Sequence, residues 1–119
     1  MRNMSFAMTT NQVRNQTKDV TRRFGWWFLK PGDLVQPVEK GMGLKKGEKA
    51  KKIGGPIRVV SVRREVVFEV TEADVKREGF PGMNAATFMK LLTDNFRKAI
   101  STSPVNRIEF EYVEKGDPK

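Results

Sequence analysis

The stretch IRVVSVRREVVFEVTEADVKREGF, residues 57–80, contains the change from strand to helix that decides the fold. Residues 57–70 are rich in Val, Ile and Phe, which predicts either one long strand or two strands joined near Arg63-Arg64. Thr71-Glu72-Ala73-Asp74 then resembles a helix N-cap and Gly79 a helix end, so a short helix is expected between them. A strand that leads directly into a helix indicates a chain that mixes both elements.

The C-terminal side adds one helix and one strand. Asn84 predicts the cap of a longer amphipathic helix that ends before Pro104. One face of this helix is apolar and contains Phe88, Leu91, Leu92, Phe96 and Ile100. Further on, residues 107–112 alternate between charged and apolar side chains, the pattern of a half-buried strand.

The N-terminal side predicts further short elements. An apolar run at 4–8 suits a strand, and Thr9 with Gln12 matches a capping box, so a short helix is expected at about 10–15. Residues 17–23 are polar but tolerate a strand, and residues 34–38 predict a strand whose Pro37 favours a sheet edge or a strand end. The expected architecture is an α+β domain, a small β-barrel flanked by short helices.

The net charge of +9 is concentrated in two segments. Residues 40–64 hold nine basic residues and one acidic residue, residues 1–23 hold five and one, and the rest of the chain is slightly acidic. Within the first segment, residues 40–56 combine lysines and glycines without a regular period, which predicts a long loop. Two interpretations remain: a face that contacts phosphates, or a solvated loop.

The chain contains no Cys and no His, which excludes thiol nucleophiles, disulfides, histidine triads and the usual zinc sites. Asp33 and Glu39 are too isolated to predict a magnesium site. No apolar run approaches the length of a membrane span. We therefore expect no metal, no cofactor and no membrane contact, and a soluble cytoplasmic protein; the sequence makes no prediction of its oligomeric state.

Residues 17–23, TKDVTRR, bring together the side chains best able to do chemistry. Lys18 can act as a base if burial or a nearby cation lowers its pKa, and Arg22 or Arg23 would supply that cation. In a regular strand Lys18 and Thr21 would point to opposite faces, so joint action requires an irregularity between them. The alternative is an ordinary surface strand.

Two further features are candidates for the same site. Glu78 lies at the predicted C-terminal end of a short helix, where the helix dipole disfavours an anion, so it is either a functional carboxylate or an exposed residue beside a cap glycine. Trp26 and Trp27 follow the arginine pair, and an aromatic ring beside cations can stack on a nucleobase. Burial of at least one Trp in the core is the alternative.

Four separated motifs resemble an ASCH domain: residues 16–23, 30–33, 70–80 and 108–110. The resemblance covers nearly the whole chain and implies one domain at 1–114, with a Lys/Gly-rich loop at about 40–56 and a frayed tail at 115–119. ASCH domains belong to the PUA-like superfamily, whose β-barrel and flanking helices form a cleft associated with RNA or nucleotides. This family fold agrees with the α+β barrel expected from the residues.

Some ASCH domains are amidohydrolases that remove the acetyl group of N4-acetylcytidine through a motif of the form G-x-K-T-x-T-x-R and a later Glu. By position, the resemblance assigns these catalytic roles to Lys18, Thr21 and Glu78, with Arg23 as the motif arginine. Gln16 stands where the motif has Gly, and Asp19 replaces a Thr. An Asp19–Lys18 pair would keep the lysine protonated.

Three function classes follow from these observations. The first is a binding module for RNA or a modified nucleotide, in which a basic cleft contacts phosphate and base. The second is a small amidohydrolase acting on an acylated nucleoside through the same residues, and the third is an adaptor whose basic face binds an acidic protein. The residues expected to contact nucleic acid are Arg22, Arg23, Trp26, Lys45, Lys46, Lys49, Lys51, Lys52, Arg63 and Arg64.

Overall fold

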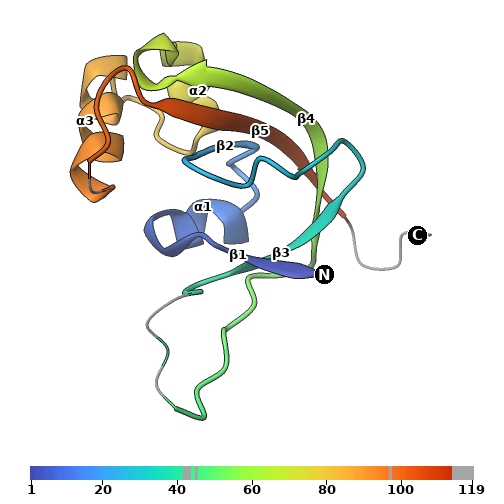
Figure 1. Ribbon diagram of the computed structural model, residues 1–119. Coiled ribbons are helices and arrows are strands. Elements are labelled where there is room, and N and C mark those ends of the chain that lie inside the picture. The colour runs from blue at the N-terminus through green and yellow to red at the C-terminus, as the bar shows by residue number, and fades with distance from the viewer. Residues whose placement is uncertain (42–43, 45, 97, 114–119) are drawn as a thin grey trace.

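Five strands form one mixed sheet in the computed structural model, which describes residues 1–41, 44, 46–96 and 98–113 (Figure 1). The strands lie side by side in the order β1, β3, β4, β5, β2. Their bounds are β1 Arg2–Ser5, β2 Val20–Arg23, β3 Leu34–Val38, β4 Ile57–Val66 and β5 Pro104–Tyr112. Only the β1–β3 pair is parallel, and the other pairs are antiparallel.

The two long strands β4 and β5 form the centre of this sheet. They pair from Ile57–Tyr112 to Val66–Pro104, with a register irregularity between Val59 and Ser61. The chain then leaves the strand geometry in the 3-10 turn η2, Val67–Glu69. The segment 57–70 is therefore one strand followed by a helical turn, and not two strands.

The helices are short and lie beside the sheet: η1 Ala7–Thr9, α1 Thr10–Arg14, α2 Glu72–Arg77 and α3 Ala85–Asn95. Two of the predicted caps are confirmed, because Thr71 Oγ1 accepts from the backbone N of Asp74 and Asn84 Oδ1 accepts from that of Thr87. The capping box at Thr9 is wrong, since its side chain makes no cap hydrogen bond.

Two other sequence expectations need correction. The first strand spans residues 2–5 rather than 4–8, because the chain turns into η1 directly after Phe6. The long helix ends at Asn95, so Phe96 and Ile100 lie beyond its apolar face and are 39% and 61% exposed.

The predicted barrel is wrong, although the α+β class is confirmed. In the described residues β1 and β2 are the two edges of the sheet, and no pairing joins them. The connection between them, which contains η1 and α1, lies between these edges (Figure 1). Phe6 and Val13 of this connection are buried in the main core, where they occupy the space that strand closure would need.

Two apolar clusters fill the interior. The larger one lies between the sheet and the N-terminal segment and includes Met4, Phe6, Ile57, Ile108 and Phe110. The smaller one, made of Val67, Val70, Val75, Phe88, Leu92 and Val105, fixes α2 and α3 against the far end of β4 and β5. The contact between β2 and α2 belongs to neither cluster, and charged side chains occupy it.

The Lys/Gly-rich segment extends away from the sheet on the side opposite α2 and α3 (Figure 1). It is attached at its base, where Ile53 is buried and its backbone N donates to Pro37 O at 2.9 Å. An isolated bridge also joins Lys52 to Val38. Lys45 and the predicted tail at 115–119 lie outside the described residues. Among the described residues, none of the helices has the length and apolar character required to cross a membrane.

Gly79 lets α2 end close to the N-terminal segment. Its φ is +104°, and a Cβ at this position would lie 2.9 Å from Gln12 Cγ and 3.1 Å from Gln12 Cβ. Gly82 has a similar φ of +90°, but a Cβ there would meet nothing within 4 Å. Comparing a substitution at Gly79 with one at Gly82 therefore distinguishes the cost of backbone strain from the cost of close packing.

We expect Gly79→Ala to lower the free energy of unfolding more than Gly82→Ala does. Both changes add the strain of an L residue at positive φ, about 1–2 kcal/mol, and only Gly79→Ala adds an overpacking cost of about 1–3 kcal/mol. Urea unfolding of the two variants measures the difference. Equal losses would show that Gln12 does not restrict this position.

Candidate functional site

A cavity of about 280 Å³ opens at the gap between the unpaired strand edges. Its walls come from the segment after β1, from β2, from the end of α2 and from α3. The lining residues are Ser5, Phe6, Ala7, Met8, Thr9, Lys18, Thr21, Arg22, Arg23, Glu78, Phe80, Phe88, Leu91, Leu92 and Phe96. The three residues assigned catalytic roles from the sequence are among them.

Lys18 and Thr21 reach the same cavity because Lys18 precedes the strand. β2 begins at Val20, so the alternation of a regular strand does not apply to Lys18. Tyr112 Oη donates to the carbonyl of Lys18 and fixes this part of the backbone. Gln16, which replaces the motif glycine, has a φ of +59°, a left-handed conformation that glycine adopts more easily.

The ammonium of Lys18 is bound to Glu78 by two contacts. Nζ donates to the backbone carbonyl of Glu78 at 2.7 Å and to Oε1 of its carboxylate at 2.9 Å. Both side chains are 3% exposed. Burial lowers the pKa of Lys18 from its usual value, and the attraction of Glu78 only partly opposes this effect.

Glu78 is the C-cap residue of α2, where the helix dipole disfavours its charge. It is buried rather than exposed, and two cations compensate for its position. Arg22 Nη1 donates to Oε2 at 2.9 Å while Lys18 occupies Oε1. Both carboxylate oxygens are therefore already engaged.

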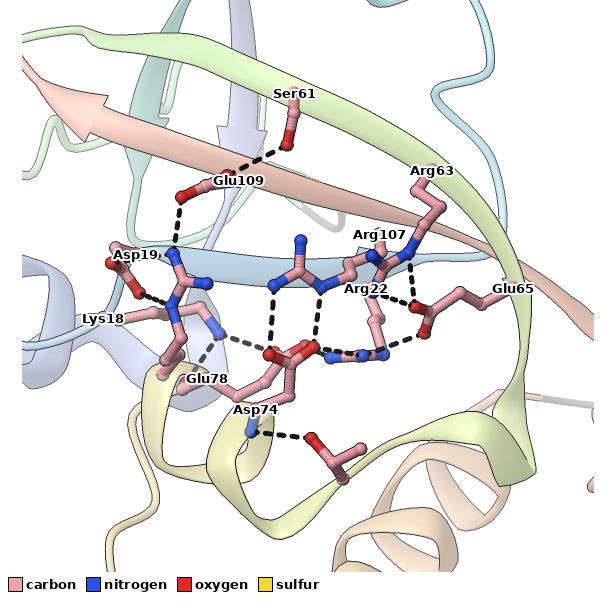
Figure 2. A network of polar contacts seen from close by, with 12 residues as sticks. Lys18, Asp19, Arg22, Ser61, Arg63, Glu65, Asp74, Glu78, Arg107 and Glu109 are labelled. Carbon is pink, nitrogen blue, oxygen red and sulfur yellow. Dashed lines mark hydrogen bonds and ion pairs between the residues drawn. The ribbon is translucent and has the colours of Figure 1, made fainter.

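Arg22 is the centre of a buried ionic network (Figure 2). Besides Glu78, its guanidinium donates to Glu65 Oε1 at 2.9 Å and to Asp74 Oδ2 at 2.5 Å. Arg107 binds the same Asp74 through Nε at 2.6 Å and Nη2 at 3.0 Å. The hydrogen bonds from Arg107, followed by those from Arg22, hold the pKa of Asp74 well below its usual range.

The sheet register explains why so many carboxylates gather here. Arg22, Arg107 and Arg63 pair directly across β2, β5 and β4. Three like charges in one row repel each other unless anions separate them. Glu65 accepts from Arg63 as well as from Arg22, and Asp74 joins Arg22 to Arg107, so a carboxylate bridges each arginine of the row to another.

Asp19 does not pair with Lys18, contrary to the expectation from the sequence. Its carboxylate accepts from Arg77 Nε at 3.0 Å and Nη2 at 3.1 Å, and Arg77 also binds Glu109 at 2.7 Å. This second cluster is partly exposed. It lies beside the buried network in Figure 2. The charge of Asp19 is thus directed away from the cavity.

Thr21 and Arg23 complete the polar wall of the cavity. Thr21 is 4% exposed, and its Oγ1 accepts from Arg23 Nε at 3.1 Å. The guanidinium carbon of Arg23 lies 4.7 Å from the centroid of the Phe6 ring. Burial lowers the pKa of Arg23 to about 10.

The opposite wall is apolar and comes from α3 and from the segments that follow α2 and α3. Phe80 and Phe88 pack at a centroid distance of 5.9 Å, and Leu91, Leu92 and Phe96 extend this wall. Phe96 stacks on Phe24 at 4.7 Å. The cavity therefore presents charged and hydroxyl groups on one side and aromatic and branched side chains on the other.

The aromatic residues after the arginine pair lie elsewhere. Trp26 packs against the main core and has a φ of +63°, while its neighbour Trp27 is 47% exposed. Arg64 lies over the Trp27 ring at 5.5 Å, and Arg63 binds Glu65. None of these four side chains lines the cavity.

The lysines of the Lys/Gly-rich segment also stand apart from the cavity. Lys46, Lys49, Lys51 and Lys52 are exposed, and none of them lines it. Lys49 and Lys51 instead line a separate recess of about 170 Å³ together with Glu39 and Glu48. The basic segment and the candidate catalytic residues therefore do not form one continuous cleft in the described part of the chain.

Sequence reasoning missed Glu65, Asp74, Asn106 and Arg107, all of which are buried. The sequence pattern indicated Asp74 only as part of a helix N-cap segment. It indicated Arg107 only as a polar position of a strand with alternating side chains. The cross-strand register that places the arginines in one row joins strands far apart in the chain, so no short sequence pattern predicts it. Among the described residues, no group of acidic side chains is arranged to hold a metal ion.

We expect Arg22→Met to reduce the free energy of unfolding by about 3–5 kcal/mol, because removing one partner leaves buried carboxylates uncompensated. Arg58→Met is the matched control, since Arg58 forms an ion pair with Glu111 in which the side chains are 34% and 53% exposed. Its loss should cost about 1 kcal/mol or less. Chemical unfolding measures both, and similar losses would contradict a structural role for the network.

The depressed pKa of Asp74 gives a pH dependence with a definite sign. The pKa of an Asp in the unfolded state is near 3.9. At acidic pH the unfolded state therefore binds a proton at this position while Asp74 of the native state is still ionised. Stability from this group is complete above about pH 5 and declines as the pH falls. Unfolding of wild type and Asp74→Asn at several pH values should show a smaller acid loss in the variant. Parallel curves would contradict this assignment.

No protein-family model and no curated protein matches the sequence. Two crystal structures match the fold. A DUF984 protein from Enterococcus faecalis superposes with a TM-score of 0.69 at 13% identity, over 94% of this chain and 75% of that protein. An ASCH domain from Lactobacillus crispatus superposes with a TM-score of 0.67 at 14% identity, over 92% of this chain and 77% of that domain. The chain therefore has the fold of an ASCH domain.

Proposed function

We propose that the cavity between β2 and α3 binds a nucleoside or a nucleotide. The single observation that carries this proposal is the convergence of Lys18, Thr21, Arg23 and Glu78 on one wall, opposite a wall of Phe and Leu side chains. Hydrogen-bonding groups can read the edge of a base, while aromatic rings support its face. The volume of about 280 Å³ lies near the lower end of ligand pockets, which favours one unit over a polymer.

Contacts to the phosphates of an RNA chain would have to come from elsewhere. The exposed lysines at 46, 49, 51 and 52 are outside the cavity, so an RNA strand would need to extend beyond the bound unit to reach them. Such contacts would add affinity that falls as salt rises. Recognition of the bound unit therefore takes place in the cavity, and the lysines form an additional surface that can contact RNA phosphates.

A second candidate function is hydrolysis of an acylated nucleoside. Burial lowers the pKa of Lys18 beside Thr21, which favours this reading, because a neutral amine can accept a proton from an attacking hydroxyl. The hydroxyl of Thr21 or of a water attacks the acyl carbon and its proton passes to Lys18. The C–N bond then breaks, and the departing amine takes that proton. Attack by water gives the carboxylic acid directly, whereas attack by Thr21 leaves an acyl-threonine ester that a water hydrolyses to the acid, which restores the hydroxyl.

Glu78 is better suited to holding Lys18 than to donating a proton in such a reaction. Lys18 and Arg22 already donate to its two carboxylate oxygens. Return of the proton to the leaving group is therefore assigned to Lys18, and Glu78 holds the amine in a fixed position. This differs from the role that the family resemblance implies for Glu78.

Calorimetric titration with cytidine and N4-acetylcytidine tests binding. We expect Thr21→Val to weaken binding about tenfold, because it removes one hydroxyl from the polar wall while keeping the shape of the side chain. Thr102→Val is the control, since Thr102 is exposed and lies outside the cavity. If neither nucleoside binds the wild type, the proposed function is wrong.

Release of acetate from N4-acetylcytidine tests the second candidate. Lys18→Met should lower the rate by about 10²–10⁴-fold, the usual contribution of a positioned base, while the variant still binds the nucleoside. Lys76→Met, at an exposed position of α2, should leave the rate unchanged. Binding by the wild type without any acetate release would exclude this activity and leave the binding function.

A further inference from the structure

Arg23 lacks the carboxylate partner that every other cation of the polar wall has. Lys18 and Arg22 pair with Glu78, and Arg107 behind them pairs with Asp74. In the described part of the chain no ion pair is recorded for Arg23. Its one hydrogen bond there runs from Nε to Thr21 Oγ1, which leaves both Nη groups without a protein acceptor.

The buried charges of the surrounding network balance without Arg23. Three buried cations, Lys18, Arg22 and Arg107, face three buried carboxylates, Glu65, Asp74 and Glu78. Arg63, which also binds Glu65, is exposed to solvent. Glu78 is the carboxylate that attracts Arg23 most, but its two oxygens accept from Lys18 and Arg22. The cavity therefore carries one positive charge that no described side chain neutralises.

Arg23 is half-buried, and an anionic partner stabilises a partly desolvated cation. Here the Phe6 ring covers one face of the guanidinium, and the cavity is the open space on which Arg23 borders. An anion that enters the cavity can accept two hydrogen bonds from the Nη groups, and such charge-assisted bonds are stronger than neutral ones.

We propose that the ligand of this cavity carries one anionic group, a carboxylate or a phosphate, which Arg23 binds, and a planar or branched apolar part that lies against Phe80, Phe88 and Leu91. This inference rests on the proposed function and names the charge class of its ligand. For a nucleotide it selects the 5′-monophosphate over the neutral nucleoside. Thr21 orients Arg23 by accepting from Nε.

Two ligand pairs test the inference, each differing in the anionic group: cytidine 5′-monophosphate against cytidine, and benzoate against benzamide. Calorimetric titration of the full chain should give tighter binding of at least one anion than of its neutral partner, by about tenfold or more. In Arg23→Gln that preference should disappear, so that the anion and its neutral partner bind with similar affinity. Arg58→Gln, which removes the same charge outside the cavity, should keep the preference.

The fold of Arg23→Gln is expected to persist, because Arg23 is half-buried and the change breaks no ion pair. A melting temperature equal to or above that of wild type would document this. Anion preference only in the benzoate pair would support a carboxylate ligand and overturn the nucleotide function, whereas preference only in the nucleotide pair would support a phosphate. If neither anion exceeds its neutral partner, or if Arg23→Gln keeps the preference, the inference is wrong even where cytidine binds.

Discussion

The guanidinium of Arg22 is the contact on which the interior of this protein depends. β2 and β4 are not neighbours in the sheet, since β5 lies between them, yet Arg22 of β2 reaches Glu65 of β4. The same group binds Asp74 and Glu78, which fixes α2 over the sheet. Apolar clusters pack on either side of this contact, but where β2 faces α2 charged hydrogen bonds replace them.

This network also prepares the cavity beside it. Because Arg22 and Lys18 share the carboxylate of Glu78, the lysine has a fixed position and Glu78 is not free to move a proton. Burial lowers the pKa of this lysine. Since the three buried carboxylates of the network pair with other cations, Arg23 remains at its border without a carboxylate partner. A buried ion network of this kind contributes little net stability compared with apolar packing. The effect of the network in this protein is to hold charged side chains rigidly beside the cavity.

Local patterns predicted much of the fold and part of the site. The strand at 34–38, the caps at Thr71 and Asn84 and the helix end at Gly79 follow from side-chain chemistry within a few residues, and the structure agrees. The barrel did not form because Phe6 and Val13 turn into the core between the two strand edges. Alternation suggested that Arg107 faces solvent, whereas register with Arg22 buries it.

The sequence by itself determined the element types, the absence of cysteine and histidine chemistry, and the presence of Lys18, Thr21 and Arg23 within one short segment. Only the tertiary structure decided which charges meet. It joined Lys18 to Glu78, 60 residues away, turned Asp19 toward Arg77, and separated the exposed lysines from the cavity. The physical reason is that a pairing between charges depends on distance and burial in three dimensions, and a one-dimensional pattern records neither.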